Sequence, residues 1–226
     1  DSIMLNVSRG CTRGCRFCMS SYLYRPLRET TIKELVNIAL KTRENTNLNK
    51  ITLIGAAVGD YYDLEGLTKA LESEGFQIAT PSLRIDSLSR ETLETLKKSG
   101  LKSITIAPES ISTLRERINK SISDEKIFSV IKNAVDLDFN IKLYFLIGIP
   151  YESKEDIEEL ANYIEKIANM HKNRNYIKFS INPVIPKPQT PLQWEVYNFK
   201  EIKSKTRYLK KKLRKYNVKF ESPKKG

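Results

Sequence analysis

The sequence predicts an α/β protein whose β-then-α units form a partial (β/α)6 TIM-like barrel. Six short apolar runs alternate with longer stretches of helical periodicity. Runs such as ITLIG (51–55) and LYFLIG (143–148) show little polar alternation, which is typical of parallel strands covered on both faces. The Gly-rich fingerprint of a dinucleotide-binding doubly wound sheet does not follow the first run. That absence favours a barrel over an open sheet, because successive right-handed units curl into one.

Each element of this barrel is marked in order along the chain. The strands are expected at Ile3–Val7, Lys50–Gly55, Gln77–Leu83, Ser103–Ala107, Lys142–Gly148 and Ile177–Pro183. Between them, helix starts are marked by residues that cap N-termini: Thr30 or Thr31, Asp63, Ser89, Ser123 and Ser153. Gly75 and Gly100 stand where two of these helices should end. The proline-rich segment 183–191 is expected to be an extended loop.

The net charge of +12 is concentrated at the C-terminal end. Residues 200–226 hold twelve Lys or Arg and two Glu, which leaves residues 1–199 close to neutral. We therefore divide the chain into a catalytic core, 1–198, and a basic C-terminal helix and tail, 199–226. The basic stretch is either a solvated helix face or a surface that contacts phosphates.

Several classes of protein are disfavoured by what the sequence lacks. No apolar run approaches the ~20 residues that cross a bilayer, and no signal segment opens the chain, so we expect a cytoplasmic protein without a membrane span. A single histidine, His171, argues against a two-histidine metal centre and a Ser-His-Asp triad. No P-loop is present. Because the first residue is Asp1, we expect a fragment of a longer protein.

All three cysteines of the chain lie in one short segment, CTRGCRFC, as Cys11, Cys15 and Cys18. An odd count in a tight loop disfavours disulfides. Structural zinc usually has four ligands, and His171 lies in a polar stretch typical of the surface. The third interpretation is an iron–sulfur cluster with three protein thiolates, which leaves one iron free to bind a substrate.

The flanks of the three cysteines favour this third interpretation. The segment follows the first strand, which places it at the carboxyl-terminal mouth of the barrel, where such folds carry their chemistry. Gly10 and Gly14 allow the chain to wrap closely around a cluster. Phe17 stands between the last two thiols, where it can contact the cofactor and exclude water.

The spacing C-x3-C-x2-C, with an aromatic residue before the last cysteine, resembles the radical S-adenosylmethionine (SAM) superfamily. Further segments resemble a branch whose members carry an N-terminal cobalamin-binding domain, and more distantly the methylthiotransferases that act on tRNA. They are SRGCTRGCRFCMSSYLYRPLRE, PSLRIDSLSRETL, TIAPESIS, INKSIS, LYFLIGIPYES and NPVIPKPQTPLQW. The resemblance implies a [4Fe-4S] cluster and SAM as cofactors. It also implies reductive cleavage of SAM to a 5′-deoxyadenosyl radical that modifies an unknown substrate, with an external one-electron reductant.

The resemblance also implies where SAM is held. Gly55 and Ala56 occupy the place of the family's Gly-Gly-Glu motif without its acid, and Asp60 is either a substitute for that acid or a solvated loop residue. Arg84 either neutralises the SAM carboxylate or pairs with Asp86. The remaining expected SAM contacts are Glu109 and Ser110 after the fourth strand, Gly148 at the end of the fifth and Asn182 in the sixth, with Glu152 noted beside Gly148. Packing alone also explains the segment around Gly148, and a plain sheet end explains Asn182. Arg25 and Arg28 either bind an anionic substrate or the SAM carboxylate, or are solvated.

Two further alternatives stay open. The basic C-terminal stretch fits contact with tRNA, as a methylthiotransferase-like enzyme requires. No DxHxxG cobalamin motif is present, so any cobalamin domain would lie outside this chain. From another class, the protein is a non-catalytic iron–sulfur electron carrier or a zinc-bound structural domain, although a carrier normally has four cysteines per cluster.

Overall fold

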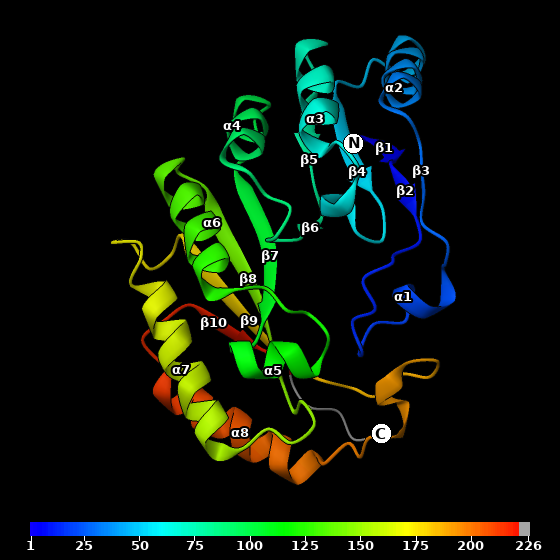
Figure 1. Ribbon diagram of the computed structural model, residues 1–226. Coiled ribbons are helices and arrows are strands. Elements are labelled where there is room, and N and C mark those ends of the chain that lie inside the picture. Colours follow the sequence, from blue (N-terminus) through cyan, green and yellow to red (C-terminus); the bar gives the residue numbers. More distant parts are fainter. Residues whose placement is uncertain (222–226) are drawn as a thin grey trace.

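The computed structural model describes residues 1–221 and contains two parallel sheets that follow one another around an arc (Figure 1). The first sheet has the strand order β1-β4-β5 and the second has the order β10-β9-β8-β7-β6. Their bounds are β1 Ile3–Asn6, β4 Lys50–Ile54, β5 Gln77–Ala79, β6 Ser82–Leu83, β7 Ser103–Glu109, β8 Asn140–Ile147, β9 Ile177–Pro183 and β10 Val218–Phe220. This arrangement confirms the α/β class and the parallel strands of the predicted barrel.

Each of the six predicted strands is present, with one interruption. The expected strand 77–83 is divided at Thr80 and Pro81 into β5, which pairs with β4, and β6, which pairs with β7. Proline has no backbone N–H and cannot continue a ladder of hydrogen bonds. The division therefore marks the point where one sheet ends and the next begins.

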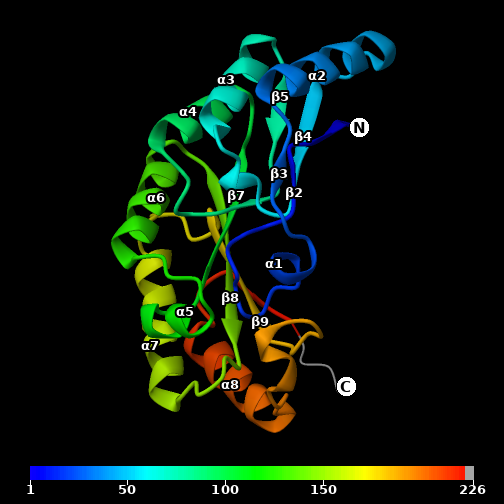
Figure 2. The same cartoon turned by 45° about the vertical axis from the view of Figure 1, so that its right-hand side comes forward.

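Helices cover the outer side of this arc, and Figure 2 shows α3, α4, α6 and α7 following one another along it. The main helices are α2 Ile32–Thr46, α3 Leu64–Ser73, α4 Arg90–Lys98, α6 Asp124–Asp136, α7 Lys154–Ala168 and α8 Phe199–Lys212. The predicted caps are confirmed, with the first at Thr31: each cap side chain accepts a hydrogen bond from a backbone N–H in the first turn, at Thr31, Asp63, Ser89, Ser123 and Ser153. Two of them, Thr31 and Ser153, form complete capping boxes.

Burial on β8 differs from the expectation that both faces are covered. Ile141, Leu143, Phe145 and Ile147 are buried in the core, whereas the residues between them, Lys142, Tyr144 and Leu146, are exposed or half-buried. Alternate residues point to opposite faces of a strand. The helices thus cover one face, and the concave face of the partial barrel is left open.

The C-terminal region contains the predicted helix, α8, and a strand, β10, that was not predicted. β10 pairs in parallel with β9 and extends the second sheet. Ile202, Leu209 and Leu213 bury the inner side of this region against the core. Residues 222–226, the end of the predicted basic tail, lie outside the described residues.

Smaller elements complete the chain. They are the antiparallel pair β2 (Ser8–Arg9) and β3 (Arg28–Glu29), the short helices α1 (Ser20–Leu23) and α5 (Ser112–Arg117), and the 3-10 turns η1 (Val58–Asp60) and η2 (Pro191–Trp194). Figure 2 shows α1 on the inner side of the arc, opposite the outer helices. Of the helices within residues 1–221, none combines the length and the apolar content that a bilayer crossing requires.

Candidate active site

The three cysteines lie on the loop that connects β2 with α1. Cys11 and Cys15 are buried, Cys18 is half-buried, and all three are free thiols. The loop is compact, because the backbone N–H of Cys18 donates to the carbonyl of Cys15 at 3.0 Å. It follows the carboxyl end of the first strand, as predicted, and so lies at the edge where the other parallel strands also end.

Glycine at position 10 is required by the backbone of this loop. Gly10 has a φ of +92°, and a Cβ atom there would lie 2.1 Å from the carbonyl oxygen of Tyr24 and 2.6 Å from that of Pro26. A side chain at this position would therefore push the loop away from the segment after α1. Gly10 thus allows the loop to approach the segment after α1 closely, whereas its predicted role in wrapping around a cluster stays a prediction.

The loop is also held from outside by the segment between α5 and α6, which the sequence analysis did not assign to the site. The Asn119 side-chain amide donates to the carbonyls of Arg13 at 3.1 Å and Gly14 at 2.9 Å. The backbone N–H of Arg16 donates to the carbonyl of Ile118 at 2.9 Å. Asn119 has a φ of +53°, a left-handed conformation that asparagine tolerates better than most residues. Three hydrogen bonds thus fix the middle of the cysteine loop.

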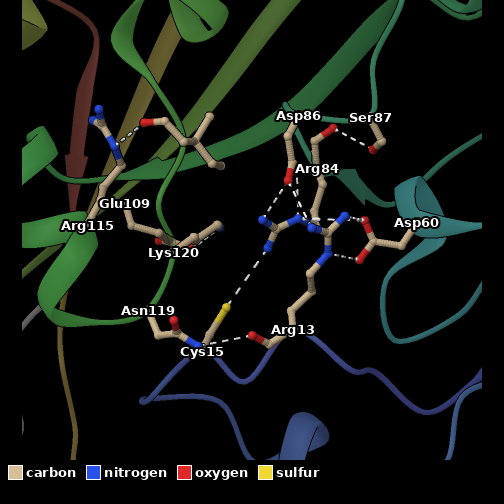
Figure 3. A network of polar contacts seen from close by, with 11 residues as sticks. Arg13, Cys15, Asp60, Arg84, Asp86, Ser87, Glu109, Arg115, Asn119 and Lys120 are labelled. Atoms are coloured by element: carbon tan, nitrogen blue, oxygen red, sulfur yellow. Dashed lines mark hydrogen bonds and ion pairs between the residues drawn. The ribbon is translucent and has the colours of Figure 1, made fainter.

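A network of charged side chains connects the loop to η1 and to the segment after β6 (Figure 3). Arg13 donates to both carboxylate oxygens of Asp60, at 2.7 and 2.9 Å. Arg84 donates to both oxygens of Asp86, each at 2.9 Å, and its Nη1 points at Cys15 Sγ at 3.9 Å. Arg13 Nη1 also lies 3.3 Å from Asp86 Oδ2, and this ion pair completes the network. The expected Arg84–Asp86 pair is therefore present, and Asp60 pairs with Arg13.

A buried ion pair lies on the other side of Cys15. Glu109 is the last residue of β7, and its carboxylate accepts a hydrogen bond from Lys120 Nζ at 2.7 Å. Burial raises the pKa of the Glu109 carboxyl, and the charge of Lys120 opposes this rise. Burial likewise raises the pKa of the Cys15 thiol, while the positive charges of Lys120 and Arg84 lower it. The effect of burial is the larger one, so the pKa of the Cys15 thiol lies above its ordinary value although Lys120 and Arg84 oppose the rise.

Other predicted SAM contacts lie at the same edge, with varied exposure. Ser110 is fully buried, and its hydroxyl has no partner among the described residues. Gly55 is half-buried, with room for no side chain, because a Cβ there would lie 2.7 Å from Ser8 Oγ. Ala56 is exposed, and Phe17 is half-buried against the core. Gly55 and Ala56 follow β4, Ser110 follows β7, and Phe17 lies on the cysteine loop itself.

Gly148 directly follows β8, and Asn182 lies at the end of β9, one residue before the last. The backbone N–H of Gly148 donates to Glu152 Oε2 at 2.8 Å, so the expected association of these two residues is present. The same oxygen pairs with Lys205 of α8 at 2.9 Å. Asn182 is half-buried, and its side-chain oxygen accepts a hydrogen bond from Ser180 at 3.4 Å.

The remaining candidates divide between the loop and the surface. Arg25 donates to the carbonyl of Thr12 at 3.2 Å and so contacts the cysteine loop, whereas Arg28 lies in β3. His171 lies after α7 and stacks on Tyr176 with the ring centroids 4.5 Å apart. It is therefore a structural surface residue, as expected.

The chemistry of the cysteine loop fits a [4Fe-4S] cluster. Three soft sulfur donors lie on one loop, and two of them receive hydrogen bonds that thiolate ligands accept: from Ser21 Oγ to Cys11 at 3.5 Å and from Arg84 to Cys15. Within residues 1–221, no group of three His, Cys, Asp or Glu side chains is arranged to hold a single metal ion.

Comparison with known proteins gives consistent results. The sequence profile of the Radical SAM superfamily matches residues 5–164. An uncharacterized protein of Methanocaldococcus jannaschii is 38% identical over 97% of this chain and 48% of its own length. A tRNA-2-methylthio-N(6)-dimethylallyladenosine synthase of Ehrlichia canis is 24% identical over 85% of this chain and 46% of its own length. The chain therefore spans about half the length of these relatives.

Among solved structures, a protein from Kitasatospora setae has a similar fold. It is the radical S-adenosylmethionine methyltransferase TsrM, with cobalamin and a [4Fe-4S] cluster bound. The TM-score is 0.70, with 10% sequence identity over 86% of this chain and 39% of that one. At this identity the likeness concerns the fold alone, and it confirms the barrel architecture expected from the sequence.

Proposed function

This chain belongs to the radical SAM superfamily, and we propose that Cys11, Cys15 and Cys18 hold a [4Fe-4S] cluster whose fourth iron binds SAM. Members of this superfamily are enzymes that use both cofactors and need a substrate and a reductant. When bound, the cluster supplies one electron that breaks a C–S bond of SAM, which releases methionine and a 5′-deoxyadenosyl radical. The observation that carries the proposal is the set of three free thiols on one clamped loop at the carboxyl edge of the barrel.

The protein's own residues hold and enclose the reactants in this proposal. Gly55 and Ala56 offer backbone groups at the end of β4, while Glu109 and Ser110 offer polar groups at the end of β7. Gly148 and Asn182 lie at the ends of β8 and β9, where the adenine of SAM is expected. Phe17 lies beside the last thiol and limits access of water. The open concave face provides the space in which SAM and the substrate meet.

Anaerobic reconstitution with iron and sulfide tests this proposal. We expect about four iron and four sulfide per chain, and 5′-deoxyadenosine on reduction with dithionite in the presence of SAM. The matched control is the triple variant Cys11→Ala, Cys15→Ala, Cys18→Ala, which should bind no cluster. A reconstituted brown protein that never forms 5′-deoxyadenosine would favour the electron carrier, and a colourless zinc protein would favour the structural domain.

For the whole protein, we propose a cobalamin-assisted methylation or rearrangement that uses a cobalamin domain outside this chain. The proposal is supported by sequence segments that resemble the cobalamin-carrying branch and by the fold shared with a cobalamin-bound methyltransferase. Three free thiols fit the reducing cytoplasm, which is the location we propose.

A second candidate function, modification of tRNA, is favoured by the basic surface of α8. Its exposed side chains are Lys200, Lys203, Arg207, Lys210, Lys211 and Lys212. Retention of tRNA by the chain should fall steeply as salt rises if these residues contact phosphates. Absence of retention at low salt would contradict this function and leave the cobalamin-assisted one.

A further inference from the structure

Two hydrogen bonds to Asp86 fix the orientation of the Arg84 guanidinium. Its Nε and Nη2 donate to the two oxygens of Asp86, each at 2.9 Å, in the bidentate geometry that is strongest for an Arg–carboxylate pair. Asp60 lies 3.7 Å from Nε on another side. Only 14% of the Arg84 side chain is exposed. The guanidinium is therefore a preorganised group with little freedom to turn.

The third nitrogen of this guanidinium points at the cysteine loop. Arg84 Nη1 lies 3.9 Å from Cys15 Sγ, and Figure 3 shows it directed across the gap between the β6 end and the loop. Cys15 is itself buried, so the contact between the two side chains is largely shielded from solvent. Asp86 occupies the Nε and Nη2 side of the guanidinium, which leaves both N–H groups of Nη1 for an acceptor on the cysteine loop.

We propose that Arg84 is a positioning residue of the cluster site, whose Nη1 donates an N–H···S hydrogen bond to the Cys15 thiolate and thereby raises the reduction potential of the cluster. The inference rests on the proposed function, because it requires Cys15 to be a cluster ligand. It assigns Arg84 a role through Cys15 in place of direct contact with SAM.

The physical reason is the charge that reduction adds. Hydrogen bonds to the ligand sulfurs and nearby charges are among the factors that set the potential of an iron–sulfur cluster. One electron from an external one-electron donor makes the site more negative, and a fixed N–H dipole on a cationic group stabilises that state more than the oxidised one. Arg84 itself gains no electron and loses no proton in this step.

The test is an anaerobic redox titration of the reconstituted chain with dithionite as the reductant, followed by EPR of the reduced cluster. For Arg84→Gln, we expect the ratio of reduced to oxidised cluster at a fixed potential to fall by about tenfold. For a one-electron couple this corresponds to a midpoint lower by ~59 mV. SAM affinity, measured by equilibrium dialysis, should stay within about twofold of the parent protein.

The matched control is Arg16→Gln in the cysteine loop itself. The Arg16 side chain donates to the carbonyl of Arg117 at 2.9 Å, so this change removes a positive charge without removing an N–H···S bond. In this control, we expect the ratio of reduced to oxidised cluster at the same potential to change by less than about threefold. Equal shifts in the two variants would show a general charge effect and overturn the proposal, as would an unchanged midpoint in Arg84→Gln.

A second variant covers the case in which Arg84→Gln does not fold. Arg84→Lys keeps the charge, but its single ammonium pairs with Asp86 and leaves no nitrogen for Cys15, so a fall in the same direction is expected. A tenfold loss of SAM affinity with an unchanged midpoint would assign Arg84 to SAM instead. If the parent chain binds no cluster or forms no 5′-deoxyadenosine, the proposed function fails. If it does both and Arg84→Gln keeps the parent midpoint, only the present inference fails.

Discussion

Glu109 combines burial, charge and an uncommon backbone conformation at the end of β7. Its φ of +71° lies in the left-handed region, which costs energy for a residue with a Cβ. Its carboxylate is enclosed and pairs with Lys120. Conformations of this kind persist where the surrounding structure over-determines them, and they cluster at functional sites. The ion pair with Lys120 is therefore what we expect to hold this corner of the site in place.

Removing Lys120 should destabilise the protein strongly. In Lys120→Met, the Glu109 carboxylate stays buried without its partner, and loss of one partner of a buried pair typically costs about 3–5 kcal/mol of the free energy of unfolding. Urea denaturation of the parent and the variant measures this difference. Lys69→Met, which removes the exposed Lys69–Glu65 pair, is the control and should change stability far less. A loss under about 1 kcal/mol in Lys120→Met would show that the buried pair does not stabilise this corner.

The lowered pKa of the Asp86 carboxyl leads us to expect that the protein loses stability in acid. Burial alone would raise its pKa, but the hydrogen bonds and charge of Arg84 hold the pKa below its ordinary value. A carboxyl with a lowered pKa in the folded state contributes stability above its unfolded pKa of about 3.9. This contribution is lost as the pH falls through the folded pKa. Between pH 5 and pH 3, the free energy of unfolding should therefore fall more in the parent than in Asp86→Asn. Parallel pH profiles, measured by urea denaturation, would contradict this assignment.

At the scale of elements, the segment between α5 and α6 acts as a clamp on the cysteine loop. Asn119→Ala should remove two hydrogen bonds and also strain the left-handed backbone at that position, at a cost of about 1–3 kcal/mol. We expect a lower iron and sulfide content after reconstitution. Asn119→Gly separates the two effects, since glycine accepts the backbone conformation but lacks the amide. Full cluster content in both variants would show that the clamp is dispensable.

The elements differ in how far the sequence could predict them. The helices with Thr31, Ser89 and Ser153 at their starts were predicted because a cap and an apolar period are local signals. Strand β10 was missed because Val218–Phe220 is three residues long and lies in a lysine-rich stretch, so only its pairing with β9 defines it. The same distinction applies to the site. The spacing of the three cysteines identified them as a site. The contacts of Arg13 with Asp60 and of Asn119 with Gly14 join residues that are 47 and 105 positions apart in the sequence, so no local pattern indicates them.

For the whole molecule, the C-terminal region is part of the core packing. Ile202, Leu209 and Leu213 of this region are buried, Tyr216 is largely buried, and Lys205 neutralises Glu152. A chain that ends at residue 198 lacks these side chains, so it should expose the apolar core surface that they cover and leave Glu152 without its cation. We expect it to be insoluble or to unfold at a clearly lower urea concentration than the full chain, measured by circular dichroism. An unchanged unfolding midpoint would instead support residues 1–198 as an independent domain.

The alternating burial of β8 has a consequence for how such a barrel can diversify. Ile141, Leu143 and Phe145 face the helices, where a change of volume is penalised, while Tyr144 and Leu146 face the open interior. Substitutions at Tyr144 and Leu146 should therefore cost less of the free energy of unfolding than substitutions at the three buried positions, so the interior side of the strand can vary while the scaffold remains intact.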